Sequence, residues 1–125
     1  MAPKPPLTVL IADDNGLFAT ALQGILEEEE SIEVVGHAAD GEEAARLAAE
    51  LGPDVVLMDL SMPRLDGFEA TRRIRANTPD TAVVVLTGSL DSEDAERATE
   101  AGAKGFVTKD RILVELVTAI RSAAR

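Results

Sequence analysis

The chain has 125 residues, which suffices for one hydrophobic core and is too short for two. With 46% hydrophobic and 28% charged residues, the composition excludes an intrinsically disordered protein, and the absence of cysteine excludes disulfides and thiolate metal sites. Acidic residues outnumber basic ones by 23 to 12, and the net charge of −11 disfavours nucleic acids and anionic membranes as direct partners.

The beginning of the chain, Met-Ala-Pro-Lys-Pro-Pro, lacks the apolar stretch of a signal peptide, and we predict a short disordered leader over residues 1–6. No later apolar run approaches the roughly 20 residues that a membrane-spanning helix needs. We therefore expect one folded domain over residues 7–125, located in the cytoplasm and without membrane contact.

The first half of the chain alternates short aliphatic runs with longer helical patterns. Residues 8–12, Thr-Val-Leu-Ile-Ala, are apolar throughout, which predicts a strand buried on both faces. Apolar residues at helical spacing predict a helix over residues 17–26, and the acidic run at 27–30 is typical of a solvated helix end. A second strand is predicted at residues 33–38, and a second helix, rich in Ala and Glu, at residues 41–51.

The second half repeats this alternation after the break at Gly52-Pro53. The same two patterns, buried aliphatic runs and helical spacing of apolar residues, recur three more times. They predict a strand at 54–60, a helix at 68–76, a strand at 81–87, a helix at 91–101, a strand at 105–108 and a helix at 111–123.

Strict alternation of buried strands and helices predicts an α/β fold with a single domain. We expect a doubly wound, five-stranded parallel sheet with helices on both faces. Five strands in this arrangement fit the flavodoxin-like order 2-1-3-4-5. Ligands of such sheets bind beyond the carboxyl ends of the strands, so the residues that end the strands are the candidates for a functional site.

The predicted strands end in residues whose chemistry fits together. Asp13 and Asp14 follow the first strand, Asp59 ends the third, Thr87 ends the fourth, and Lys109 follows the fifth. Two carboxylates about 4 Å apart repel by roughly 4 kcal/mol at an effective dielectric near 20, and Mg²⁺ would remove that penalty. One carboxylate could then attack phosphorus, with the lysine, the hydroxyl and the cation facing the phosphoryl oxygens.

Several of these polar residues also have simple structural interpretations. Asp14 or Asn15 could cap the helix that follows, and Asp66 with Glu69 has the pattern of a helix-capping box. His37 is the only histidine and is expected to be a polar residue near a strand end. Taken singly, none of the strand-end residues indicates a function. Together they do, because all of them fit the same phosphoryl-transfer chemistry.

The ordered set resembles the receiver domain of bacterial two-component response regulators, and the resemblance spans nearly the whole chain. The family has an acidic pair after the first strand, a phosphoacceptor aspartate ending the third, and a proline and a glycine in the next loop. It also has a hydroxyl residue that ends the fourth strand and is followed by a small residue, a lysine after the fifth strand, and an aromatic switch residue three positions before that lysine. The matching residues are Asp13-Asp14, Asp59, Pro63, Gly67, Thr87-Gly88, Phe106 and Lys109.

For the metal, the resemblance implies that Asp14 ligates Mg²⁺ directly, Asp13 largely through water, Asp59 with one oxygen and Ser61 with its backbone carbonyl. For the chemistry, it implies that Asp59 takes a phosphoryl group from a phosphohistidine of a sensor histidine kinase or a histidine phosphotransfer protein. The chain would thus be a phosphoacceptor switch, which catalyses only its own phosphorylation and dephosphorylation, rather than an enzyme.

The resemblance also implies how the signal leaves the domain. Lys109 and Thr87 would contact the phosphoryl oxygens, and the inward movement of Thr87 would free space for Phe106 to turn from exposed to buried. The surface formed by the fourth helix, the fifth strand and the fifth helix would change shape and be read by an output domain or effector protein. Dimerisation through this surface would also be typical of the family.

The chain departs from the family pattern in one place. Many receivers follow the lysine with a proline in a cis peptide, whereas here Lys109 is followed by Asp110. A cis bond without proline costs about 3 kcal/mol, so we expect a trans bond. Lys-Asp resembles the subgroup whose regulators carry a helix-turn-helix DNA-binding domain. Ser61 and Ser89, each two residues beyond a site residue, are expected to tune the rate of phosphoryl hydrolysis.

Three alternatives remain from the residues alone. A phosphohydrolase of the haloacid-dehalogenase type would want a second aspartate two residues after the nucleophile, where this chain has Ser61. A flavin-binding carrier of the same fold would want aromatic stacking, and the chain has no Trp or Tyr. A degenerate receiver that acts as a constitutive interaction module is disfavoured because all five strand-end residues are intact.

Overall fold

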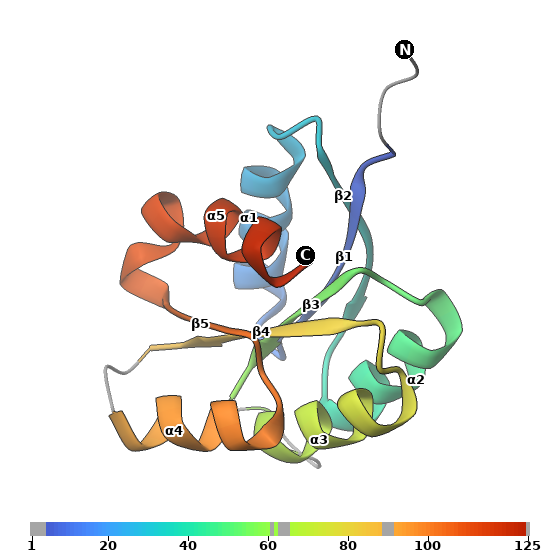
Figure 1. Cartoon of the computed structure of the whole chain (residues 1–125). Coiled ribbons are helices and arrows are strands. Elements are labelled where there is room, and N and C mark those ends of the chain that lie inside the picture. The colour runs from blue at the N-terminus through green and yellow to red at the C-terminus, as the bar shows by residue number, and fades with distance from the viewer. Residues whose placement is uncertain (1–4, 61, 63–65, 89–91, 125) are drawn as a thin grey trace.

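The computed structural model describes residues 5–60, 62, 66–88 and 92–124. Every predicted strand and helix is present in it, with ends shifted by no more than one residue. In chain order the elements are β1 Leu7–Ala12, α1 Gly16–Glu27, β2 Ile32–Ala38, α2 Gly41–Leu51, β3 Val55–Asp59, α3 Gly67–Asn77, β4 Ala82–Thr87, α4 Ser92–Ala101, β5 Gly105–Thr108, the 3-10 turn η1 Lys109–Arg111 and α5 Ile112–Ala123 (Figure 1).

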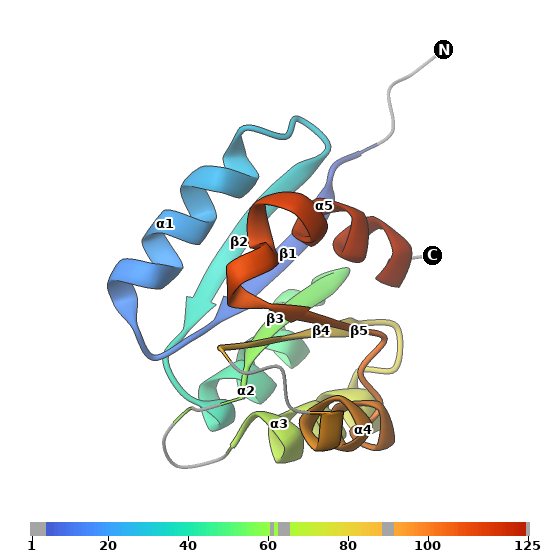
Figure 2. The ribbon, with the colours of Figure 1, turned by 90° about the vertical axis from the view of Figure 1, so that its left-hand side faces the viewer.

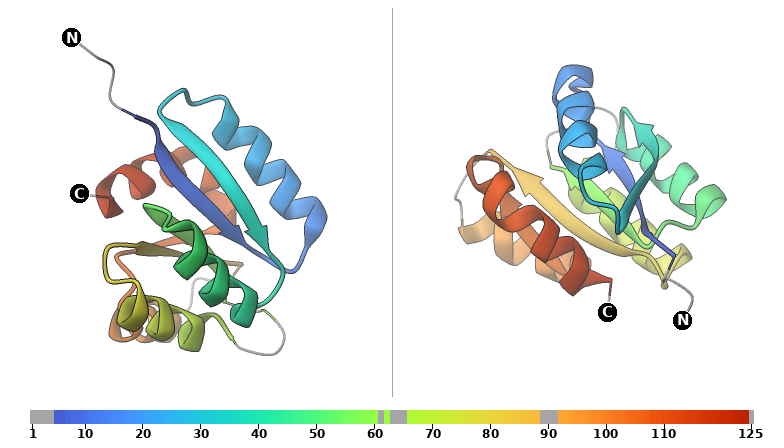
Figure 3. Two further views of the ribbon diagram at one scale, coloured as in Figure 1. Left: turned by 90° about the vertical axis from the view of Figure 1, so that its right-hand side faces the viewer. Right: turned by 90° about the horizontal axis from the view of Figure 1, so that it is seen from above.

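The strands form one parallel sheet in the order β2-β1-β3-β4-β5, which confirms the predicted topology. All residues of β3 and β4 are buried, as their unbroken aliphatic sequences predict for central strands covered on both faces. The edges of the sheet are β2 and β5 (Figures 2 and 3). The carboxyl ends of β1, β3, β4 and β5 therefore meet along one side of the molecule.

Helices cover the two faces of the sheet unequally, as Figure 2 shows: α1 and α5 lie on one face, and α2, α3 and α4 on the other. Successive side chains of a strand point to opposite faces of the sheet. Alternate residues of each strand therefore belong to two separate hydrophobic clusters, one on each face. In β4, Val84 and Leu86 join the cluster under α1 and α5, whereas Val83 and Val85 join the cluster under the other three helices.

Two helix starts that bear on the site are capped by side chains. Asn15 caps α1, because its side-chain oxygen accepts a hydrogen bond from the Phe18 N–H at 3.2 Å. Asp66 caps α3 in the same way by accepting the Glu69 N–H at 2.9 Å, which confirms the predicted cap at this helix. With Asn15 in the capping role, the carboxylate of Asp14 is left for another function.

The remaining sequence-based expectations about the backbone concern His37, the lysine peptide and the leader. His37 lies within β2, and its Nε2 is 2.6 Å from Gln23 Oε1 of α1, so it links this helix to the sheet edge.

No peptide bond within the described residues is cis, which confirms the trans bond expected between Lys109 and Asp110. Residues 1–4 of the expected leader lie outside the described residues. Over the described part of the chain, none of the helices is both long and apolar enough to cross a membrane.

Candidate functional site

Polar side chains stand at the carboxyl ends of four neighbouring strands. Asp13 directly follows β1, Asp59 ends β3, Thr87 ends β4 and Lys109 directly follows β5. Because these strands are adjacent and parallel, their carboxyl ends bring the four side chains to a single edge of the sheet. This is the place where open α/β sheets bind ligands.

Three carboxylates gather at this edge. One oxygen of Asp13, one of Asp14 and one of Asp59 all lie within 4.8 Å of one another. Asp13 and Asp59 are only 5% and 6% exposed, whereas Asp14 is exposed to solvent. Carboxylates this close repel one another, and a divalent cation that prefers hard oxygen ligands would be attracted to all three.

Lys109, which follows β5, extends its side chain toward the carboxylate cluster. Its Nζ lies 3.3 Å from Asp13 Oδ2 and 3.6 Å from Asp59 Oδ1. The lysine side chain is only 28% exposed, so its charge is partly shielded from water where it meets the two buried carboxylates. The ammonium thus stands beside the carboxylate that ends β3, close enough to meet any anionic group attached there.

The Asp13 carboxylate is held in place through both of its oxygens. Oδ1 accepts the Asn15 backbone N–H at 2.8 Å, and Oδ2 accepts a hydrogen bond from Lys109 at 3.3 Å. The Asp13 N–H donates in turn to the Ala38 carbonyl at 3.0 Å, which fixes the turn after β1 against β2. The Asp13 carboxylate is therefore held in one orientation by hydrogen bonds, whereas the Asp14 carboxylate faces solvent.

Gly67, which begins α3, packs directly against the backbone that carries Asp59. A Cβ at position 67 would lie 2.5 Å from the Asp59 carbonyl oxygen and 2.8 Å from the Leu60 Cα, so only glycine fits. The Gly67 N–H also donates to the Leu60 carbonyl at 3.4 Å. The start of α3 thus packs against the backbone at the end of β3. This close contact accounts for the glycine eight residues after Asp59.

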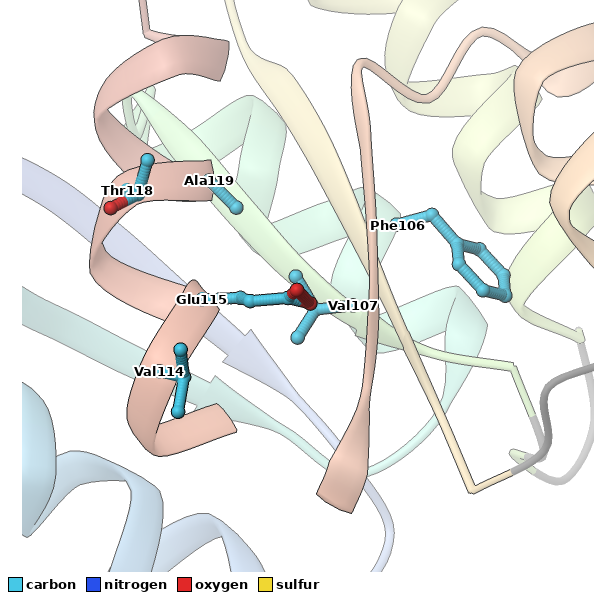
Figure 4. Close-up of a pocket in the computed structure, with 6 residues that line it drawn as sticks. All are labelled: Phe106, Val107, Val114, Glu115, Thr118 and Ala119. Atoms are coloured by element: carbon cyan, nitrogen blue, oxygen red, sulfur yellow. The ribbon is translucent and has the colours of Figure 1, made fainter. Parts of the chain in front are cut away.

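Thr87 and Phe106 lie on the face of the sheet that α4 covers. Thr87 is buried, and Phe106, which is half-buried, packs against the hydrophobic cluster on that face. Figure 4 shows the Phe106 ring on the side of β5 away from α5, while Val107 points toward that helix. The two residues to which the family resemblance assigns the switch therefore occupy adjacent strands on the same face.

Thr108 is a neighbour of Thr87 that no sequence pattern marks as a site residue. The two residues are paired across β4 and β5. Thr108 is 5% exposed, and its hydroxyl has no hydrogen-bond partner among the residues that the structure describes. A buried hydroxyl without a partner is unusual, because the group has lost its hydrogen bonds to water without replacing them.

Some sequence-predicted positions lie outside the described residues, and one contact was missed. Ser61, Pro63 and Ser89 fall outside the described ranges. Phe18 was predicted only as part of the apolar face of the first helix, yet the Lys109 Nζ lies 4.2 Å from the centre of its ring. The one signal in the sequence is that Phe18 falls in the first helical turn after the acidic pair, and this does not specify the direction of its side chain.

Comparison with known proteins assigns this arrangement to a family. The family model described as "Response regulator receiver domain" matches residues 9–121. The transcriptional regulatory protein LiaR of Bacillus subtilis is 41% identical over 119 residues, covering 95% of this chain and 56% of LiaR. The response regulator GacA of Pseudomonas aeruginosa is 44% identical over 115 residues, covering 92% of this chain and 54% of GacA. The chain thus spans about half the length of these curated relatives.

Solved structures agree with the sequence matches. A LuxR-family two-component response regulator from Aurantimonas superposes with a TM-score of 0.91 at 37% identity, covering 95% of this chain and 85% of the other. The response regulator domain of CheB from Thermotoga maritima gives a TM-score of 0.89 at 32% identity, covering 95% and 96% of the two chains.

Proposed function

The chain belongs to the response regulator receiver domain family of two-component signalling, and from this premise we propose that Asp59 is the residue that carries the phosphoryl group. The observation that carries the proposal is the position of Asp59, which lies within one cluster with Asp13 and Asp14 and 3.6 Å from the Lys109 Nζ. A nucleophile that must accept an anionic group needs positive charge beside it, and this site offers both a lysine and a place for a cation.

The donor set of the site suits Mg²⁺, because three carboxylates offer hard oxygen ligands close together. Asp14 would bind the ion directly, Asp13 largely through water, Asp59 with one oxygen and Ser61 with its backbone carbonyl. When bound, the ion would neutralise the carboxylates and the phosphoryl oxygens. The exposure of Asp14 fits a ligand that shares the ion with retained water.

Three side chains of this domain would each have a separate role in the transfer step. An Asp59 carboxylate oxygen attacks phosphorus, the bond between phosphorus and the histidine nitrogen breaks, and the histidine leaves with its electron pair. Lys109, already beside Asp59, would pair with a phosphoryl oxygen, and the Thr87 hydroxyl would donate a hydrogen bond to another. Hydrolysis of the resulting acyl phosphate would return Asp59 to its free form, so the domain acts only on itself.

The output would follow from the pairing of Thr87 with the phosphoryl group. Movement of Thr87 toward Asp59 leaves room on the α4 face, into which the half-buried Phe106 ring would turn. A groove of about 340 Å³ between β5 and α5 borders this face and would change with it (Figure 4); its lining residues are Phe106, Val107, Val114, Glu115, Thr118 and Ala119. An output domain or effector protein would read the change on the α4, β5 and α5 surface.

The wider context of the domain is part of the same proposal. The partner that supplies the phosphoryl group would be a sensor histidine kinase or a histidine phosphotransfer protein in the cytoplasm. The receiver domain would span residues 7–125. Because LiaR is named a transcriptional regulator and is about twice as long, the signal would pass to a transcriptional output, with homodimerisation through the switch surface as one route. The acidic receiver itself would not contact nucleic acid.

The experiment is to incubate the chain with Mg²⁺ and acetyl phosphate and to measure its mass. We expect the parent to gain one phosphoryl group and Asp59→Asn to gain none. Asp54→Asn is the matched control, since Asp54 precedes the same strand and its carboxylate binds the Thr8 N–H at 2.9 Å, far from the site. Repeated turnover of a phosphomonoester without an adduct would contradict the proposal and favour a phosphohydrolase.

A further inference from the structure

The aromatic ring of Phe18 lies against the ammonium group that the proposed chemistry depends on. Lys109 Nζ is 4.2 Å from the centre of that ring, and it also faces Asp13 at 3.3 Å and Asp59 at 3.6 Å. We infer that Phe18 is a positioning residue, whose ring face holds the Lys109 ammonium within reach of Asp59 before a phosphoryl group arrives. The inference rests on the function proposed above.

The place of the ring is fixed by the start of α1. The Phe18 N–H donates to the Asn15 side chain at 3.2 Å, which closes the first turn of the helix. The Phe18 side chain is half-buried and packs against the hydrophobic cluster beneath α1 and α5. The same turn carries the Asn15 N–H that binds Asp13. One short segment therefore places both the ring and one of the carboxylates that Lys109 contacts.

A lysine needs such support because its side chain is long and flexible. Four methylene groups give the ammonium many positions, and carboxylates on one side do not by themselves select the one nearest Asp59. The face of an aromatic ring carries negative charge density and attracts a cation placed over it. With carboxylates on one side and the ring on another, the ammonium is confined to the space beside Asp59.

A second cation-π pair elsewhere in the molecule provides a matched control. The guanidinium of Arg97 in α4 lies 3.9 Å from the centre of the Phe68 ring in α3, on the opposite face of the sheet. Phe68 is buried, so its truncation removes more packing than that of Phe18. A loss of function that came only from reduced stability would therefore be larger at Phe68.

The test measures the rate at which acetyl phosphate and Mg²⁺ phosphorylate the chain, followed by mass. A small phosphodonor needs no docked partner protein, so the rate reports the site itself. We expect Phe18→Leu to lower the rate by about two- to fivefold, the range that a partly exposed cation-π contact corresponds to. Phe18→Tyr keeps a ring face and should retain the parental rate, and Phe68→Leu should lower the rate less than Phe18→Leu does.

Two further measurements separate positioning from packing. In the Lys109→Met background, Phe18→Leu should have no additional effect on the rate, because Phe18 acts through the lysine. In NMR spectra, the methylene protons next to the Lys109 ammonium should lose the ring-current shift in Phe18→Leu. Equal rates for Phe18→Leu and the parent, or equal losses in Phe18→Leu and Phe18→Tyr, would overturn the inference.

The same experiments distinguish failure of this inference from failure of the proposed function. If the parent gains no phosphoryl group, the proposed function fails, and the NMR comparison alone decides whether the ring holds the lysine. If the parent is phosphorylated and the ring-current shift is unchanged in Phe18→Leu, the function stands and the positioning role fails. A rate loss in Phe68→Leu as large as that in Phe18→Leu would also count against the positioning role.

Discussion

At the scale of single residues, the buried hydroxyl of Thr108 leads to a stability prediction. The hydroxyl has no partner among the described residues, and leaving such a group unpaired costs roughly 1–3 kcal/mol. Valine has nearly the same shape without the hydroxyl. We therefore expect Thr108→Val to raise the free energy of unfolding by about 1 kcal/mol, measured by urea denaturation.

Thr81→Val is the matched control for this prediction. Thr81 is also buried, but its hydroxyl donates to the Pro53 carbonyl at 2.7 Å. Removing this hydroxyl leaves the carbonyl without that bond, so Thr81→Val should destabilise the chain by about 1 kcal/mol. Changes of opposite sign in the free energy of unfolding of the two variants would support an unpaired hydroxyl at Thr108. A loss of stability in Thr108→Val would show instead that this hydroxyl has a partner in solution.

The comparison of these residues shows what a sequence can indicate at this scale. Asp13, Asp59, Thr87 and Lys109 could be selected because each ends or follows a predicted strand, and the backbone alone decides where strand ends meet. The contact of Phe18 with Lys109 could not be predicted in this way. It depends on side-chain rotamers and on the distance between a helix and a strand end, which hydrophobic periodicity does not encode.

At the scale of elements, the start of α3 and the end of β3 form one rigid junction. A Cβ at Gly67 would meet the Asp59 carbonyl at 2.5 Å, a contact with backbone rather than with a side chain that could move aside. Gly67→Ala should therefore destabilise the chain by about 2 kcal/mol or more and slow phosphorylation of Asp59. Urea denaturation and the acetyl phosphate assay measure the two effects.

Gly24→Ala is the control for the junction. Gly24 lies in the exposed middle of α1, and a Cβ there would meet nothing within 4 Å. Alanine should stabilise that helix by about 0.5–1 kcal/mol, because it restricts the unfolded chain more than glycine does. If Gly67→Ala proved as harmless as Gly24→Ala, the junction would not hold Asp59 as described.

The ends of the elements show why sequence patterns place helices and strands to within a residue but not their contacts. The helix predicted at 17–26 begins at Gly16 because Asn15, not a hydrophobic residue, caps it. The strand predicted at 54–60 begins at Val55, because the Asp54 carboxylate accepts the Thr8 N–H and hydroxyl of β1, and Asp54 keeps, among the described residues, a backbone bond only to β4, through its carbonyl. At both element starts, a side-chain hydrogen bond to the backbone sets the first residue.

At the scale of the whole molecule, the fold was predictable because two independent patterns agree. The alternation of strands and helices fixes a parallel sheet, and the unbroken apolar sequences of β3 and β4 require helices on both faces. The net charge of −11 adds a constraint that neither pattern contains. Like charges destabilise the compact state, and a cation at the three clustered carboxylates would relieve part of this repulsion.

Magnesium should therefore raise the thermal stability of the unmodified chain. If the ion binds only the folded state, a concentration of about ten times its Kd contributes roughly 1.4 kcal/mol, or about 5 °C in the melting temperature of a chain of this size. Asp14→Ala should melt higher than the parent without metal, because one repelling carboxylate is gone, and should respond little to Mg²⁺. The melting temperatures of the two proteins should thus converge or cross as Mg²⁺ is added, as measured by calorimetry.

Asp80→Ala separates this site effect from general screening of the acidic surface. Asp80 is exposed in the turn before β4, and its replacement changes the net charge by the same amount as that of Asp14. Screening depends on ionic strength and on the charge of the whole molecule, so it would raise the melting temperatures of both variants alike, and sodium chloride at equal ionic strength would reproduce it. Binding at the strand ends requires Asp14, so only Asp80→Ala should keep the parental response to Mg²⁺. Equal responses of both variants would place the ion elsewhere and remove the reason to assign Asp14 to the metal.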